Sequence, residues 1–368
     1  MLYTIPDYYK EFSCTADQCE DTCCAGWQIV IDKKSLKKYW NEKGPYKKKL
    51  RNSIKWIQGV FKQSPDKRCA FLNDDNLCDM YKNLGEKSLC KTCKLYPRHI
   101  EEFEGVREIT LSVSCPEVAK ILLNKDEPAE FLSYEKDGEE EYEDFDFILY
   151  SKLVDARDIM REFLQNRELD IKVRAGLVLG MAHDMQVRIN HENIFGMEDV
   201  FDRYQTEKAI AHVKKKLEIA ESRPMHIKHE RAQERFQKLH ELELLRADWQ
   251  VHLWETGDIL YKKGSQNYID IKAEFDSWMK EHLPRWEIMS EQLLVYFIHT
   301  YFCGAVYDAN VYAKARMAVD SVFFIYEMLA ARWIRNEKEL NMEDIIEIVY
   351  RYSREVEHSD DNLKQMEE

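Results

Sequence analysis

The stretch CAFLNDDNLCDMYKNLGEKSLCKTCKLYPR, residues 69–98, carries four of the chain's ten cysteines. The stretch FSCTADQCEDTCCAGWQIVID, residues 12–32, carries four more, and only Cys303 lies beyond residue 115. Cysteines two or three residues apart can turn both sulfurs toward one metal ion. We therefore predict that the first third of the chain folds around metal-bound thiolates. The candidate ligands are Cys14, Cys19, Cys23, Cys24, Cys69, Cys78, Cys90, Cys93 and Cys115.

The number of thiols leaves the number of metal sites open. One tetrahedral zinc ion or one cubane cluster needs four ligands, so nine cysteines leave room for a second site or for structural thiols. Cys23 and Cys24 are adjacent, and neighbouring side chains in extended backbone point to opposite faces, so the two can serve different sites. The Cys-x3-Cys-x2-Cys triplet of radical enzymes would need a cysteine at position 26, where the chain has Gly26.

The first twelve residues, MLYTIPDYYKEF, contain neither the basic region nor the apolar run of a secretory signal. We therefore expect a cytoplasmic protein. In that compartment thiols are kept reduced, which favours metal binding over disulfides. Disulfides or idle thiols are the alternative.

The composition indicates a globular protein, because 45% of its 368 residues are hydrophobic and can bury a core. No apolar run approaches the ~18 residues that suggest a membrane span, so we expect no membrane partner. The chain has 54 Lys and Arg against 68 Asp and Glu, a formal net charge of −14. This charge disfavours nucleic acid, whose binding depends on neutralising phosphates with cations.

The apolar pattern changes along the chain and predicts three parts. Residues 1–124 form a cysteine-rich metal-binding region, in which QIVID at residues 28–32 resembles a strand. Residues 125–146 contain a proline, a glycine and a dense acidic run, which predict an acidic linker. Residues 147–368 form an all-helical domain. The predicted fold class is therefore mainly α, with a small cysteine-rich region followed by an all-α helical domain.

Beyond residue 147, apolar residues recur at the spacing of buried helix faces. The stripes are Leu149, Leu153, Ala156, Met160 and Phe163; Phe236, Leu239, Leu242, Trp249 and Leu253; Leu294, Phe297, Tyr301 and Ala305; and Ile345, Val349, Tyr352 and Val356. Asn341, three residues before Asp344, predicts the N-cap of the last helix. Residues 224–262 could form one extended helix or a broken pair, and Gly176 and Gly180 would share a helix face that allows close packing. The twelve glycines contain no G-x-G pair, so neither a dinucleotide-binding turn nor a P-loop is present.

The cysteine blocks at residues 12–32, 69–98 and 111–123 (LSVSCPEVAKILL) resemble those of the flagellin lysine-N-methylase family. EQLLVYFIHTYFCGAVYDANVYAKARMAVDS, residues 291–321, is similar to that family too, so the resemblance covers nearly the whole chain. The middle block also resembles the small cysteine-cluster proteins described as zinc- or iron-chelating.

This resemblance implies a bacterial cytoplasmic enzyme that transfers methyl groups from S-adenosylmethionine to lysine ε-amines of flagellin, the protein of the bacterial flagellum. It also implies an iron-sulfur cluster, 4Fe-4S in type, held by some of the nine cysteines, with zinc as the alternative metal. The match does not decide which cysteines bind. Cys14 departs from the small family, because four residues rather than two separate it from Cys19.

Lysine methylation needs a group that removes a proton from the amine and a surface that holds a cationic sulfonium. Aromatic faces and carboxylates attract both cations. From their proximity to the cysteines, we predict Tyr96 and Asp32 as candidates for catalysis and Trp27 for binding the methyl donor. Arg98 could bind the donor's carboxylate. Packing around the metal site, or an ordinary ion pair for Arg98, is the alternative.

Two classes of function are compatible with these residues. The first is a protein-lysine N-methyltransferase with an iron-sulfur cluster, which the family resemblance favours. The second is a non-enzymatic cysteine-rich metal-binding or electron-transfer module on a helical scaffold, in which the metal supplies folding energy to a small region.

Overall fold

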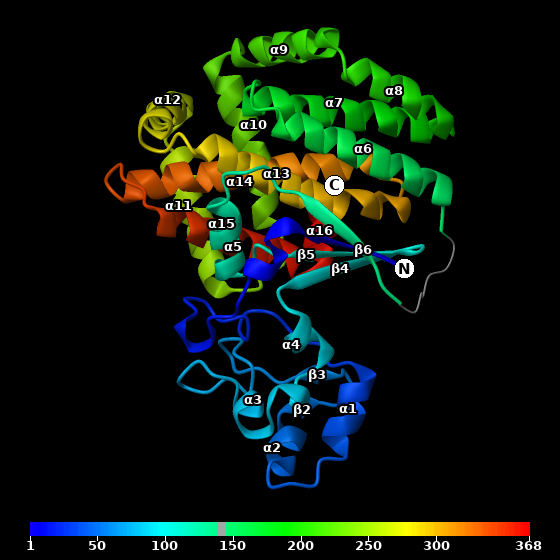
Figure 1. The fold of residues 1–368 in the computed structure, drawn as a ribbon. Coiled ribbons are helices and arrows are strands. Elements are labelled where there is room, and N and C mark those ends of the chain that lie inside the picture. The colour runs from blue at the N-terminus through cyan, green and yellow to red at the C-terminus, as the bar shows by residue number, and fades with distance from the viewer. Residues whose placement is uncertain (138–144) are drawn as a thin grey trace.

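The computed structural model describes residues 1–137 and 145–368. Figure 1 shows long helices stacked above a small sheet, with a separate group of short elements below it. We call residues 13–97 the thiol lobe, and the described residues of 1–12 and 98–368 the helical body. The predicted fold class, mainly α with a cysteine-rich N-terminal region, is confirmed.

The thiol lobe consists of short elements joined by turns. They are η2 (Ala16–Gln18), α1 (Lys33–Trp40), α2 (Lys47–Asn52), β2 (Ile54–Lys55), β3 (Val60–Phe61), α3 (Asp79–Leu84), η3 (Glu86–Ser88) and α4 (Lys91–Leu95). The segment 28–32, expected as a strand, makes only an isolated bridge from Val30 to Val60, and Asp32 then caps α1.

The helical body contains most of the long helices. Its helices are η1 (Asp7–Glu11), α5 (Pro116–Leu123), α6 (Phe147–Gln165), α7 (Ile171–Asn190), η4 (Ile194–Gly196), α8 (Met197–Tyr204), α9 (Glu207–Glu221), α10 (Met225–Gln237), η5 (Lys238–His240), α11 (Ala247–Leu260), α12 (Ser265–His282), α13 (Trp286–Tyr301), η6 (Phe302–Val306), α14 (Val311–Arg335), α15 (Met342–Glu357) and α16 (Asp360–Glu367). Residues 224–262 therefore form a broken pair, α10 and α11, rather than one helix.

Helix α13 lies at the centre of the body, and every residue from Met289 to Tyr301 is buried. Its apolar residues are spread around the whole helix, which is the pattern of a helix surrounded by other elements. Glu291 is fully buried there and pairs with Arg167 and Arg174 at 2.8 and 2.9 Å. A buried carboxylate needs such partners, because an unpaired charge is costly in the interior.

The residues of the four predicted apolar stripes are buried. The second stripe is divided among α10, η5 and α11, and its Leu242 lies in none of them. Asn341 is an N-cap as predicted, because its side chain accepts a hydrogen bond from the amide of Asp344, and the Asp344 side chain accepts one from the Asn341 amide. The helix that it begins, α15, is not the last one, however, because α16 follows. The close packing expected at Gly176 and Gly180 is also present. A Cβ atom on Gly176 would lie 2.6 Å from Cγ1 of Val213, and one on Gly180 would lie 2.8 Å from the hydroxyl of Tyr204.

One sheet lies between the helices and the thiol lobe, and the sequence did not predict it. Its strand order is β4-β5-β1-β6, with β1 (Leu2–Pro6) parallel to β5 (Val106–Leu111) and antiparallel to β6 (Phe131–Glu135). The antiparallel neighbour of β5 is β4 (Arg98–Phe103). Strand β6 falls inside the segment 125–146 expected as an acidic linker, so part of that segment is sheet; residues 138–144 lie outside the described residues.

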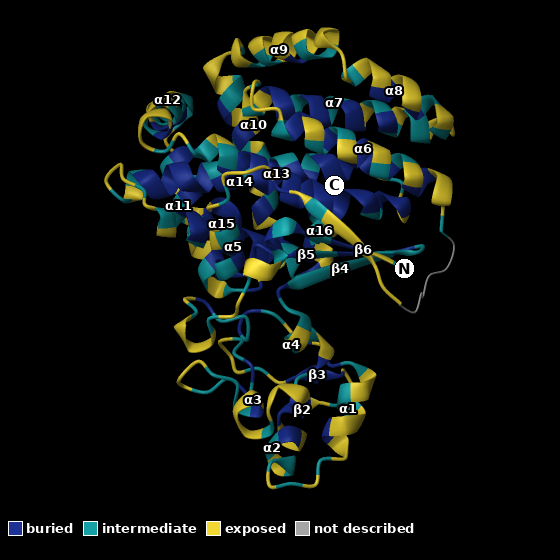
Figure 2. Ribbon diagram, viewed as in Figure 1, coloured by how far each residue is buried: buried dark blue, intermediate teal, exposed yellow. Residues whose placement is uncertain are grey.

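The buried apolar side chains form two clusters that divide the chain at other positions than the expected boundary. One cluster holds the helical body together and includes Tyr8, Phe103 and Cys115 from the N-terminal third. The other holds the thiol lobe together. Figure 2 shows the difference, with a large buried interior above and mostly intermediate or exposed residues below. Within residues 1–137 and 145–368, no helix is long and apolar enough to cross a membrane.

Candidate functional site

Five of the nine predicted ligands belong to the core of the thiol lobe. Cys69 and Cys90 are buried in it, and Cys24, Cys78 and Cys93 pack against it. The backbone brings them together, because the amide of Cys69 donates to the carbonyl of Cys24 at 2.8 Å. A hydrogen bond with Cys90 and burial raise the pKa of Cys93, and negative charge on Cys24 and Cys69 raises it further.

The other four predicted ligands lie where the thiol lobe meets the helical body. Cys19 donates through Sγ to the carbonyl of Asp21 at 3.3 Å, and Cys115 is buried at the start of α5. Burial raises the pKa of Cys19, and charge on Cys14 adds to this rise. Burial likewise raises the pKa of Cys115, and charge on Cys19 adds to it. Cys14 itself is exposed.

The adjacent pair Cys23 and Cys24 connects the two groups of thiols. A hydrogen bond from Cys23 lowers the pKa of Cys24 to about 7, and the same bond raises the pKa of Cys23. A second pair, Cys90 and Cys93, behaves in the same way, with the pKa of Cys90 lowered by its hydrogen bond from Cys93. In each pair one sulfur therefore loses its proton more readily than the other, and a thiolate is the form that binds metal.

The donor chemistry suits iron or zinc, since both bind cysteine thiolates. The described side chains do not converge closely enough to share one ion, however. Over residues 1–137 and 145–368, no three His, Cys, Asp or Glu side chains form a group that could hold a metal ion. Metal binding by the nine cysteines therefore stays a prediction.

A cavity of about 450 Å³ lies at the junction of the thiol lobe and the helical body. Its volume falls in the range of small-molecule sites. Three of the four residues predicted for catalysis or donor binding line it, namely Trp27, Tyr96 and Arg98. The body contributes Glu357 and His358 from the C-terminal end of α15.

One wall of the cavity is aromatic. The ring of Trp27 lies 5.6 Å from that of Tyr96 and 4.2 Å from that of His358, measured between centroids. The hydroxyl of Ser114 fixes two of these rings, since it lies 3.2 Å from the Tyr96 hydroxyl and 2.8 Å from Nε2 of His358. Burial, together with the charge of Arg354, lowers the pKa of His358 to about 3, so its ring is neutral at physiological pH. Burial raises the pKa of Tyr96, which disfavours a tyrosinate there.

The carboxylate of Glu357 also lines the cavity. The hydroxyls of Tyr296, Tyr301 and Ser112 donate to its Oε2 at 2.5, 2.7 and 3.2 Å, and the hydroxyl of Ser353 donates to its Oε1. Burial raises the pKa of Glu357, and the hydroxyl hydrogen bonds offset this rise only in part. Glu357 is thus an enclosed carboxyl group that is held by neutral donors.

The remaining candidates differ in where they lie. Arg98 stacks on the rings of Tyr9 and Phe12, and its Nε donates to the hydroxyl of Tyr9 at 2.7 Å. Asp32 is not among the residues that line the cavity. Its carboxylate accepts from the amides of Ser35 and Lys91 at 2.9 and 2.8 Å, which caps α1 and joins it to α4. This arrangement favours a structural role for Asp32.

Sequence reasoning missed Glu357 and His358, which lie more than 240 residues from the last of the clustered cysteines. They follow Val356 on α15, in a stretch without any motif. The apolar stripe of α15 predicted a buried helix, but no pattern indicated that its end would face the cysteines.

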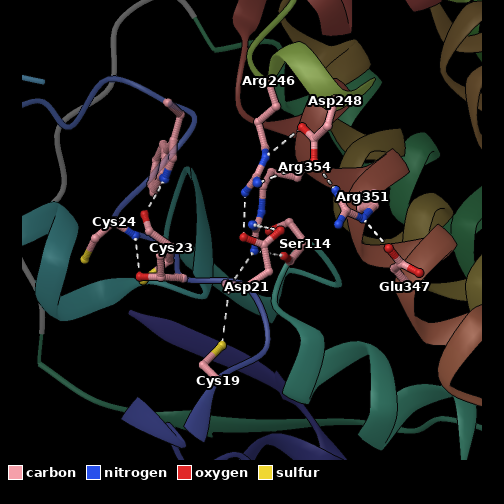
Figure 3. Close-up of polar contacts among 12 residues, drawn as sticks. Cys19, Asp21, Cys23, Cys24, Ser114, Arg246, Asp248, Glu347, Arg351 and Arg354 are labelled. Atoms are coloured by element: carbon pink, nitrogen blue, oxygen red, sulfur yellow. Dashed lines mark hydrogen bonds and ion pairs between the residues drawn. The ribbon is translucent and has the colours of Figure 1, made fainter. Parts of the chain in front are cut away.

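An ion-pair network joins the segment of Cys19 to Cys24 to the helical body, as Figure 3 shows. The carboxylate of Asp21 lies between Arg246 and Arg354, at 2.5 and 2.9 Å. Arg354 also donates to the carbonyl of Ser114 at 2.9 Å. Gly26 allows the close approach, because its φ is +96° and a Cβ atom there would lie 2.8 Å from Cγ of Arg246. We call this network the Asp21 anchor.

Comparison with known proteins gives one matching family and several related proteins. Residues 157–368 match the family described as FliB lysine N-methylase C-terminal domain. The flagellar biosynthetic protein FliU of Salmonella muenchen is 34% identical over 130 residues, which are 33% of this chain and 76% of that protein. The lysine-N-methylase of Salmonella typhimurium is 34% identical over 130 residues, 33% of this chain but only 32% of that protein. No solved structure matches.

Proposed function

This chain belongs to the FliB lysine N-methylase family, and from that premise we propose that it methylates lysine ε-amines on flagellin with S-adenosylmethionine as the donor. We further propose that the reaction takes place in the cavity between the thiol lobe and the helical body, in the cytoplasm. The flagellar and methylase names of the relatives support the substrate.

The observation that carries the location is the pairing of aromatic rings with a carboxylate in one cavity. Both reactants of lysine methylation are cations, a sulfonium and an ammonium, and aromatic faces and carboxylates attract cations. Trp27 and Tyr96 would face the sulfonium, and Arg98 would bind the donor's carboxylate. Holding both reactants in line supplies much of the rate of such a displacement.

We also propose that cysteines of the thiol lobe bind an iron-sulfur cluster of the 4Fe-4S type, with zinc as the alternative. The support is the gathering of Cys24, Cys69, Cys78, Cys90 and Cys93 about one small core. Bound metal would keep these sulfurs as thiolates and would order the lobe.

The test uses protein purified without oxygen. Incubation with S-adenosylmethionine and flagellin should add methyl groups to flagellin lysines, measured by mass spectrometry of its peptides. Flagellin with its lysines replaced by arginine is the matched control. Absence of any mass increase on the lysine-bearing flagellin would reject the enzyme and favour the metal-binding module.

The cluster is tested on the same preparation. We expect iron and acid-labile sulfide in stoichiometric amounts and a broad visible absorbance. If the protein contains zinc and no sulfide, zinc is the bound metal and the iron-sulfur proposal is wrong. If a metal-free protein still methylates flagellin, no resident metal is needed.

A further inference from the structure

Unlike buried Glu108 and Glu291, Glu357 has no Lys or Arg ion pair among the described residues. Buried Glu355 has none either, and the charge of His99 acts on Glu357. Buried Glu108 forms two hydrogen bonds to Arg157, at 2.5 and 2.6 Å, and buried Glu291 pairs with Arg167 and Arg174. For Glu357, the part of the chain that the structure describes provides four hydroxyl donors and no Lys or Arg ion pair.

A carboxylate in a poorly solvated place is stabilised most by an opposite charge. The cavity in front of Glu357 is open to a ligand, and its aromatic wall is suited to a cation. Among the described residues no Lys or Arg ion pair supplies that charge, and a cationic ligand in the cavity can supply it.

Resting on the proposed lysine methylation, we propose that Glu357 is a catalytic residue that binds the substrate lysine's ammonium group and accepts its proton. At pH 7 only about one free lysine in 2,500 carries a neutral amine, so an acceptor is needed. The ammonium transfers one proton to the carboxylate and becomes a neutral amine. The amine nitrogen then forms a bond to the donor's methyl carbon while the carbon–sulfur bond breaks and its electron pair stays on sulfur. The products are a methylammonium, a neutral thioether and a carboxylic acid at Glu357, with the total charge unchanged.

The charged and titratable groups around Glu357 come from three elements. Helix α13 contributes the hydroxyls of Tyr296 and Tyr301, and β4 contributes His99, whose Nε2 lies 2.8 Å from Glu101. On its own helix, His358 is held neutral by burial, and Arg354 is engaged with Asp21. Burial lowers the pKa of His99, but the hydrogen bond to Glu101 and the charge of Glu357 raise it, and the net direction is upward.

The experiment compares Glu357→Gln with Glu343→Gln, an exposed position in the first turn of the same helix. Glutamine keeps the shape and can still accept the tyrosine hydroxyls, but it cannot take a proton. We expect kcat on flagellin to fall at least about 100-fold at pH 7 in Glu357→Gln and to stay unchanged in Glu343→Gln. The residual rate should rise about tenfold per pH unit, because the amine must then lose its proton to solvent.

Binding of labelled S-adenosylmethionine, measured by equilibrium dialysis, distinguishes the roles that one carboxylate could have. Unchanged donor binding in Glu357→Gln agrees with a role toward lysine. Lost donor binding would overturn the proposal, because Glu357 would then hold the donor's amino group. An active wild type with an equally active Glu357→Gln variant would overturn it as well, whereas an inactive wild type would reject the proposed function itself.

Tyr301→Phe provides a second test that does not depend on removing the carboxylate. The Tyr301 hydroxyl lowers the pKa of Glu357, so its loss should move the acidic limb of the rate profile to higher pH. An unmoved limb in a folded, active Tyr301→Phe protein would exclude Glu357 as the group that titrates.

Discussion

The thiol lobe and the helical body obtain their order from different sources. The body has long helices around a continuous core, whereas the longest helix of the lobe, α1, has eight residues. Helices that short are marginal without tertiary support. The buried apolar core of the lobe is small, and two of its members are Cys69 and Cys90. The body therefore has a core large enough to order it by burial, whereas the small core of the lobe would gain most from the metal that we propose.

We expect the largest effect from chelation of the metal that we propose in the lobe. Structural metal sites contribute on the order of 10 kcal/mol, so chelation should unfold the lobe and spare the body. Hydrogen exchange should show lost protection across residues 13–97 and retained protection in α13 and α14. Cys69→Ala should reproduce the loss, and Cys303→Ala, at a buried cysteine of the body, should leave the metal content unchanged. A chelated lobe as well protected as the loaded one would show that its small core is sufficient.

The body was the part that the sequence predicted well. Its apolar residues repeat along single helices, as in Leu149 to Phe163 on α6, so the pattern is local and complete within one segment. The sheet was not predicted because its strands come from segments that are far apart in the sequence. Tyr3 pairs with Tyr134 on one side and with Arg107 on the other.

In the candidate site, too, only the residues that lie close to the cysteines in sequence were predicted. Trp27, Tyr96 and Arg98 could be proposed because they lie within a few residues of cysteines in sequence. Glu357 and His358 reach the same cavity from the other end of the chain, through the packing of α15. No local pattern records such an approach, since it is fixed by the docking of the two regions.

The contribution of the Asp21 anchor to the contact between the lobe and the body can be tested by mutation. Asp21→Asn removes the charge that faces buried Arg354, and breaking a buried ion pair typically costs about 3–5 kcal/mol. We expect the segment 13–26 to become sensitive to limited proteolysis while the body keeps its thermal unfolding transition. Asp17→Asn, at an exposed position in the same segment, is the control and should resist cleavage like the wild type. Equal resistance of both variants would mean that packing alone holds the segment.

A smaller effect is expected from pH at the same junction. Burial raises the pKa of Glu355 to about 7, and its Oε2 accepts from the amide of Leu245 at 2.8 Å. The folded state therefore binds the proton more tightly than the unfolded state does. The stabilisation is fully present below the unfolded pKa near 4.5 and is lost as pH rises through 7. The loss amounts to roughly 3 kcal/mol, from about 1.4 kcal/mol per pKa unit.

Glu355→Gln tests this assignment because glutamine is neutral at every pH and can still accept from Leu245. Urea unfolding of the wild type from pH 5 to pH 8 should show falling stability, and the variant should show a flatter dependence over that range. The charge of Asp248 raises the pKa of Glu355 and that of Lys67 lowers it. Both charges are retained in Glu355→Gln, so the variant differs from the wild type only at position 355. A variant with the same slope as the wild type would assign the pH dependence to another group.

The smallest effect is expected at the far end of α15, where the helix begins. Asn341→Ala removes the hydrogen bond to the Asp344 amide, at a typical cost of about 1 kcal/mol, and Asn341→Ser should retain most of the stability because serine caps equally well. The loss should appear in the urea unfolding of the body and should leave the metal content of the lobe and the binding of the methyl donor unchanged. Since α15 carries Arg354 and Glu357 at its other end, a loss of donor binding in Asn341→Ala would mean that the start of the helix and the cavity are coupled. The two regions would then share one cooperative unit, and the separation between a burial-ordered body and a thiol-ordered lobe would fail.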